Sequence, residues 1–274
     1  MNRTNLKRIF LLTLLLLSPF YAEVFAQDSL SVKDAKLEFL RDIDQRNWRI
    51  KLPLWVPGFR GSFAYASLST LPEDRFEFVS KLEGELGVTF YFVGDLRFQP
   101  KDWLFSIDGF HTTLANSLKF ENIDKVSFEG AIDGTILRGL AGYRIFEKPL
   151  NENYFSASVF PYVGLRYIDL DIYSTKSDIL RIRPDWFEVL VGIDIPLRYK
   201  RWDFKAQIEV GGFGINNHWS SFYALNTGYR FSPLFSMGAG WTYLSFNYDQ
   251  GEGLGNLDLD IQLSGPMISI EFHL

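Results

Sequence analysis

The 274-residue sequence contains no cysteine, so the fold must be held together by something other than disulfide bonds. Long apolar runs are also missing: beyond the N-terminus, no stretch approaches the roughly 18 apolar residues of a membrane-spanning helix. Basic residues are outnumbered, at 28 Lys and Arg against 33 Asp and Glu, which argues against nucleic acid as a partner. These absences exclude a helical membrane protein and leave a soluble β protein or a membrane β-barrel.

The N-terminus predicts export from the cytoplasm. Three basic residues precede the apolar run 9–18, and the compact residues Val24 and Ala26 favour cleavage after Ala26. Residues 1–26 are therefore expected to be a secretory signal peptide, and no lipobox cysteine follows. Residues 27–47 are expected to be a periplasmic lead-in, either loose or a short amphipathic helix, with a lumen plug as an alternative.

Alternation of apolar and polar residues dominates the rest of the chain, as in YKRWDFKAQIEVGG (199–212). A period of two predicts β-strands with two different faces. Several of the runs exceed the five or six residues usual in soluble strands. We expect an all-β, antiparallel, up-and-down transmembrane barrel of about ten strands, with eight or twelve as alternatives. The predicted strands are 48–66, 82–98, 103–117, 125–146, 154–173, 185–200, 202–215, 220–232, 235–249 and 257–274.

The connections between these strands differ in length, as the two ends of an outer-membrane barrel do. The short ones are 99–102, 147–153, 200–201 and 232–234, and most others, such as 70–78 and 248–256, are longer and polar. Aromatic residues flank the short turns, and such rings favour the membrane–water interface. The predicted interface aromatics are Phe98, Trp103, Tyr199, Trp202, Phe231 and Phe235.

Charged residues of both signs lie well inside the strands, on the face opposite the apolar one. On a single strand this is an ordinary solvated surface, but over ten strands it predicts that the apolar face meets lipid and the charged face lines a lumen. Buried charges are stable only when paired, so we predict one cross-lumen network in which Glu188 and Asp194 hold Arg166 and Arg198. The predicted members are Arg49, Lys51, Arg166, Glu188, Asp194, Arg198, Asp203, Lys205 and Glu209.

The phase of the alternation changes just after Tyr167 and Tyr243, and again near Gly265-Pro266. A β-bulge at each point is one explanation. The other is that these segments rise beyond the lipid, where apolar residues turn inward. We favour the second explanation, which predicts a barrel mouth narrowed by apolar packing.

Short motifs in one collinear order over residues 48–274 resemble a broad family of uncharacterised bacterial outer-membrane β-barrel proteins. They include LPLWVPGFRGSF (52–63), GLAGYRI (139–145), WTYLSFNYD (241–249) and LSGPMISIEFHL (263–274). The resemblance implies an outer-membrane barrel and transfers no catalytic residue. The terminal strand also resembles the insertion signal of such barrels, but it ends on Leu274 instead of an aromatic residue.

Candidate chemistry is sparse. The only histidines are His111, His218 and His273, and His218-Trp219-Ser220 faintly resembles the His-x-Ser arrangement of lipid A deacylases. A base and a nucleophile also need an orienting third group, which the sequence does not identify. The acidic residues Asp249, Glu252, Asp258 and Asp260 are interpreted as solvated loop charge, with divalent cations bridging lipopolysaccharide as the alternative.

We therefore expect residues 48–274 to form an integral protein of the cell outer membrane, acting as a narrow or plugged channel or as a structural protein. The alternatives are an outer-membrane lipid-modifying enzyme and a ligand-binding or adhesion barrel that uses its extracellular loops. The expected partners are outer-membrane lipids, lipopolysaccharide and the insertion machinery. No catalytic residue, metal or cofactor is predicted.

Overall fold

The computed structural model describes residues 46–55, 58–65, 75–79, 88–122, 127–148, 155–174, 181–213, 218–249 and 257–274. These residues form fourteen β-strands in a single sheet, and no helix among them is long and apolar enough to cross a membrane. The strands are β1 (Trp48–Trp55), β2 (Gly58–Tyr65), β3 (Arg75–Val79), β4 (Val88–Phe98), β5 (Trp103–Asn122), β6 (Ser127–Tyr143), β7 (Phe146–Lys148), β8 (Phe155–Ser174), β9 (Arg181–Ile182), β10 (Asp185–Tyr199), β11 (Trp202–Gly211), β12 (Trp219–Ser232), β13 (Phe235–Asp249) and β14 (Leu257–His273).

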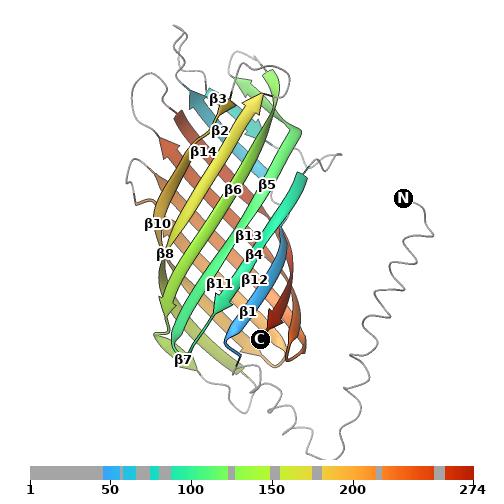
Figure 1. Cartoon of the computed structure of the whole chain (residues 1–274), viewed down its shortest axis with the longest axis vertical. Helices are drawn as coiled ribbons and strands as arrows, with labels where there is room; N and C mark the ends of the chain where they lie inside the picture. Colours follow the sequence, from blue (N-terminus) through green and yellow to red (C-terminus); the bar gives the residue numbers. More distant parts are fainter. Residues whose placement is uncertain are drawn as a thin grey trace, which may run out of the picture. The chain divides into compact units, whose positions relative to one another are not determined.

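The sheet closes into an antiparallel barrel with ten strand positions around its circumference, and we call each position a stave (Figure 1). One stave is made by β1 and β2, which pair in succession with β14, and another by β3 and β4, which pair in succession with β5. The short strands β7 and β9 are additional and pair with β8. The predicted all-β barrel of about ten strands is confirmed. One local prediction was wrong, because Arg75–Val79 is a strand and not part of a loop over 70–78.

The first and last strands form the closing seam of the barrel. Trp48 and Leu274 exchange two backbone hydrogen bonds, Trp48 N to Leu274 O at 3.1 Å and Leu274 N to Trp48 O at 2.9 Å. The pairing of β1 with β14 continues from this point to Trp55 and Met267. We call this end of the barrel, which also carries the tight turn between β10 and β11, the short-turn end. The opposite end, where β2, β5 and β13 finish, is called the loop end (Figure 1).

The outer surface of the barrel is apolar over a band of limited height. On β10, the outward residues from Phe187 to Tyr199 are all apolar, whereas Asp185, next towards the loop end, is polar and exposed. At about 3.3 Å per residue this run measures about 40 Å along the strand, and a tilt of about 45° reduces it to about 28 Å. That height is close to the apolar band of about 25 Å on transmembrane barrels.

On β8, β13 and β14 the inner face changes from polar to apolar towards the loop end without a shift in register. The pairings of β8 with β6 and of β13 with β14 continue without a register shift past Tyr167, Tyr243 and Pro266. Towards the loop end the apolar residues of these strands, such as Ile168 and Leu244, point into the barrel and are buried. Of the two explanations for the altered alternation, the inward packing of apolar residues is the one that the structure has.

Candidate functional site

Aromatic side chains form a girdle at the short-turn end. Trp48 stacks on Phe98 with ring centroids 4.3 Å apart, and Trp103 meets the edge of Tyr143 at 5.2 Å. All six predicted interface aromatics lie here, flanking the short turns or the seam. The girdle also includes residues that the sequence analysis did not single out, and its members are Trp48, Phe98, Trp103, Tyr143, Tyr199, Trp202, Tyr229, Phe231, Phe235 and Phe272.

Five charged side chains from five consecutive staves meet in the middle of the lumen, and we call them the central ion network. They are Asp108 on β5, Arg138 on β6, Arg166 on β8, Glu188 on β10 and Glu209 on β11. Arg138 donates to Asp108 at 2.9 Å and to Glu209 at 2.8 Å, while Arg166 donates to Glu188 at 2.5 Å and also pairs with Glu209. Because Arg166, Glu188 and Glu209 are at most 3% exposed, their charges depend on one another for stability.

Neutral polar groups add further partners to this network, although Glu188 Oε2 is buried without a hydrogen-bond partner. The Tyr162 hydroxyl donates to Glu209 and accepts from the Gln207 amide, both at 3.0 Å. Ser220 Oγ donates to Glu188 at 2.8 Å and accepts from Arg166 at 3.1 Å. A Cβ at Gly192 would overlap the ring of Tyr162, so glycine at this position is what admits the tyrosine. Each polar atom that remains bonded lowers the cost of burying the charges.

A second set of ion pairs lies closer to the short-turn end and corrects one prediction. Asp194 accepts from Arg97 at 2.7 Å and lies 3.7 Å from the Lys205 ammonium, while Arg198 donates to Asp203 at 3.0 Å. The prediction that Asp194 holds Arg198 was therefore wrong. The cause is geometric, since Arg97 reaches Asp194 from a distant stave, across the lumen. The predicted charges thus fall into separate groups along the barrel axis.

A cavity of about 450 Å³ occupies the lumen at the short-turn end, and we call it the basic cavity. Its lining includes nine Lys and Arg residues against four Asp and Glu residues. Arg49 and Lys51, which the sequence predicted to belong to the charge network, line this cavity. No ion pair within 4 Å joins either of them to a described acidic residue.

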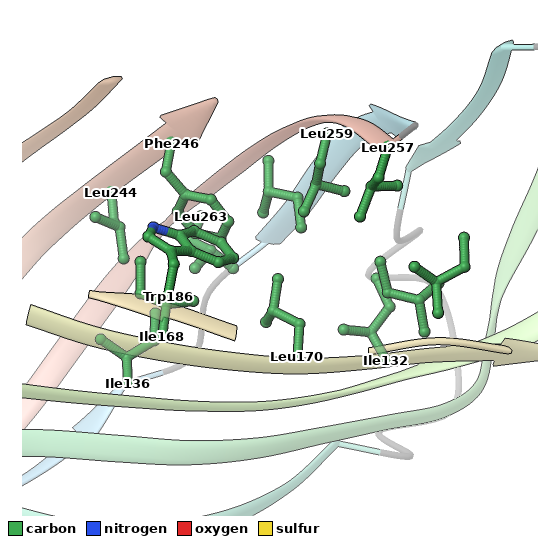
Figure 2. Packing of buried hydrophobic residues seen from close by; sticks show 13 residues of the cluster. Ile132, Ile136, Ile168, Leu170, Trp186, Leu244, Phe246, Leu257, Leu259 and Leu263 are labelled. Carbon is green, nitrogen blue, oxygen red and sulfur yellow. The ribbon is translucent and has the colours of Figure 1, made fainter. Parts of the chain in front are cut away.

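Towards the loop end, the lumen is filled by apolar side chains instead. Figure 2 shows residues of β6 and β8 pointing towards residues of β13 and β14 across the interior. Trp186 on β10 packs among them, with its ring centroid 5.6 Å from that of Phe246. We call this cluster the apolar layer, and its buried members are Ile132, Ile136, Ile168, Leu170, Ile172, Ile182, Trp186, Leu244, Phe246, Leu257, Leu259, Ile261 and Leu263.

His218 lies beside the apolar layer, in a ring stack rather than in a catalytic arrangement. Its imidazole stacks on Tyr248 with centroids 4.4 Å apart, and burial lowers the pKa of this imidazole below its usual value. Its Nδ1 is buried without a hydrogen-bond partner. Ser220, the nucleophile that the sequence suggested, has its hydroxyl bonded to Glu188 and Arg166. This arrangement gives the serine an acid and an arginine as partners and provides no base–nucleophile pair.

The other two histidines and the acidic loop residues have partners within the fold where the structure describes them. His111 Nδ1 lies 2.8 Å from the Thr135 hydroxyl, and His273 Nε2 lies 2.9 Å from the Ser236 hydroxyl. Among the acidic loop residues, Asp249 and Asp258 are paired in the β13–β14 register. Glu252 lies outside the described residues, as does the predicted lead-in apart from residues 46 and 47.

The sequence analysis missed several interior partners. Arg97 and Tyr162 were not singled out, although Arg97 has the same parity as the polar Asp95 and Tyr162 the same parity as Arg166. Arg138 and Arg230 were recognised only as members of a polar face. Parity within a strand was the signal that could have placed all four inside the barrel.

No family model and no curated protein matches this chain. Among solved structures, the attachment invasion locus protein Ail of Yersinia pestis is similar, with 11% identity over 82% of this chain and 99% of its own, at a TM-score of 0.26. Neisserial surface protein A has 12% identity over 83% of this chain and 97% of its own, at a TM-score of 0.26. The translocator domain of the autotransporter NalP from Neisseria meningitidis has 12% identity over 88% of this chain and 95% of its own, at a TM-score of 0.33. Values this low give no information on function, which depends on the side chains of this chain.

Proposed function

We propose that this chain is an integral outer-membrane β-barrel with a closed lumen, which serves as a structural membrane protein and not as an open pore. The membrane location is supported by the apolar band of about 28 Å on the outer surface, by the aromatic girdle at one end and by the expected signal peptide. These are the features that a barrel needs to satisfy both lipid and the interface.

The observation that carries the proposal is that two layers of side chains, the central ion network and the apolar layer, fill the lumen at different heights along its axis. The central ion network joins five consecutive staves and reaches a sixth, since the Arg138 guanidinium lies 4.6 Å from the ring centroid of Phe222 on β12. On β10, Trp186 of the apolar layer is only two residues from Glu188 of the network, so the apolar layer lies directly next to the central ion network along the barrel axis. A solute would have to separate buried ion pairs and then lose its water among aliphatic side chains.

Planar-bilayer recording of the refolded protein tests the closed lumen. We expect no stepwise conductance, whereas an open porin refolded and inserted by the same procedure provides the positive control. Regular conductance steps from the wild type would contradict the closed lumen. Unboiled protein should migrate differently from boiled protein in detergent gels, and identical mobility together with solubility without detergent would contradict the membrane barrel itself.

Variants can test the central ion network and the apolar layer separately. Replacing Arg166, Glu188 and Glu209 together by alanine leaves only the Arg138–Asp108 pair of the central ion network but keeps the apolar layer, so this variant should show no conductance. Adding Trp186→Ala and Phe246→Ala should then produce conductance, because the apolar constriction is widened as well. Conductance from the first variant would show that the ion network alone is the seal.

A further inference from the structure

We infer that the basic cavity is a binding site for a small anion with a phosphate group, open to solutes at the short-turn end. This goes beyond the closed lumen, because a site at one mouth needs no path through the barrel. Lys51, Asp95 and Lys205 are the lining residues of their strands that lie furthest from the short-turn end, and the central ion network lies deeper still. A ligand that enters can therefore leave only by the way it came.

The charge balance of the lining favours an anion. Nine basic residues face four acidic ones, and the two further acids that pair with lining arginines, Asp194 with Arg97 and Asp102 with Arg144, raise the acidic count only to six. Some basic residues are internally neutralised, as Arg144 is by Asp102 at 2.6 Å and by Glu147 at 2.7 Å. Even so, the cavity retains an excess of positive charge within a space of about 450 Å³. Enclosed charge of one sign concentrates counter-ions of the other.

The excess is concentrated near the seam. Lys51 and Glu271 are register partners across β1 and β14, and Arg49 on the same strand is the register partner of His273. Glu271 and Asp95, the register partner of Lys51 on β4, are the acidic residues beside these two cations, while Arg49 faces Arg97 on β4. The carboxyl groups of Glu271 and Asp95 attract these cations, but no ion pair within 4 Å holds Arg49 or Lys51 to a described acidic residue.

A buried donor inside the cavity provides the second, independent observation. Arg230 is 1% exposed and pairs with Asp203 through Nε and Nη2, but its Nη1 is buried and has no hydrogen-bond partner. An unbonded donor of a buried guanidinium carries the desolvation cost of that group. Because Arg230 lines the cavity, an anion there would accept from Nη1 and remove this cost.

Room for the ligand is created by small residues on one wall. Gly228 on β12, Gly238 on β13 and Ser269 on β14 are paired in register and form a row across three staves. All three line the cavity. The basic side chains of the lining are mostly arginines, and the planar guanidinium matches the oxygens of a phosphate group with two parallel hydrogen bonds. Size, charge and donor geometry thus agree on a phosphate-bearing anion.

Calorimetric titration of the refolded full-length barrel tests the site, in zwitterionic detergent at low salt, with inorganic phosphate and pyrophosphate as probes. We expect saturable binding to one site, tighter for pyrophosphate because of its higher charge. Arg230→Gln should weaken binding at least tenfold. Lys51→Gln, which leaves the buried ion pairs intact, should weaken binding severalfold and serves if Arg230→Gln does not fold. Arg183→Gln, at an exposed position away from the cavity, is the matched control and should bind like the wild type.

Two results would overturn the inference. One is the absence of saturable binding, and the other is equal weakening by Lys51→Gln and Arg183→Gln, which would mean a diffuse charge effect.

A lipid headgroup is the other source of a phosphate group, and vesicles separate the two sources. Affinity for pyrophosphate should be the same in zwitterionic vesicles and in vesicles containing phosphatidylglycerol. A tenfold loss in the second would show that lipid occupies the site. A conducting wild type would refute the closed lumen and leave this binding result unaffected.

Discussion

Removal of Arg166 is the most direct test of how the interior is stabilised. Arg166 is 2% exposed and pairs with Glu188 and Glu209, so Arg166→Met leaves two buried carboxylates with fewer partners. Breaking a buried pair from one side typically costs about 3–5 kcal/mol. Here Glu188 would keep the Ser220 hydroxyl and Glu209 would keep Arg138, so we expect the lower end, about 3 kcal/mol.

The free energy of unfolding of this variant can be measured by denaturant titration in lipid vesicles with tryptophan fluorescence. The matched control is Arg181→Met, because Arg181 makes two hydrogen bonds to Asp171 but its side chain is 57% exposed. This control should cost at most about 1 kcal/mol. Combining Arg166→Met with Glu188→Gln should recover part of the loss, since the pair is coupled by about 0.5–3 kcal/mol in such cycles. Equal losses for Arg166→Met and Arg181→Met would refute the view that the buried network stabilises the barrel.

Two further predictions concern the outer face and the loop end. Ile208→Arg places a charge on the lipid-facing side of β11 and should lower the free energy of unfolding by about 2–4 kcal/mol. Asp169→Arg, at an exposed polar position of β8, should fold as the wild type does. Heat-dependent gel mobility after refolding measures both variants, and a greater loss of folding for Asp169→Arg than for Ile208→Arg would mean that the inner and outer faces are assigned the wrong way round. The pKa of His218 is lowered by burial, so the unfolded chain binds a proton more readily and stability should fall as pH drops through about 6.5. His218→Phe keeps the ring stack and should flatten this part of the stability curve, and parallel pH curves for the two proteins would contradict the assignment.

The strands were predictable because alternation is a local signal. Predicted and observed bounds agree for 235–249 and differ by one residue at each end for 154–173, which is Phe155–Ser174 in the structure. The strand Arg75–Val79 was missed because it is short and mixes charged residues with aromatic ones beside a turn-like sequence. The inward apolar packing towards the loop end was also predictable, since the shift in alternation is what the end of a lipid-facing band would produce.

The pairing of interior charges was only partly predictable. Glu188 and Arg166 face each other in the β8–β10 register, so neighbouring strands are enough to suggest that pair. Arg97 and Asp194 are 97 residues apart and sit on staves that are not adjacent. Contacts across a lumen depend on the stagger and diameter of the closed barrel, which no local pattern encodes. The basic cavity was missed for the same reason, because its wall of small residues exists only once three strands are in register.

The seam between β1 and β14 has a consequence for assembly. Leu274, which follows β14, bonds to Trp48, the first residue of β1, so the ring of hydrogen bonds is incomplete until β14 has been added. Until then both terminal strands present open edges, and an open edge is costly in lipid and adhesive in water. For the proposed membrane barrel, we therefore expect that a temporary partner pairs with those edges while the unfinished chain enters the bilayer. A truncation of only the final strand should consequently remain in the periplasm as a target for proteolysis, even though the other nine staves are intact.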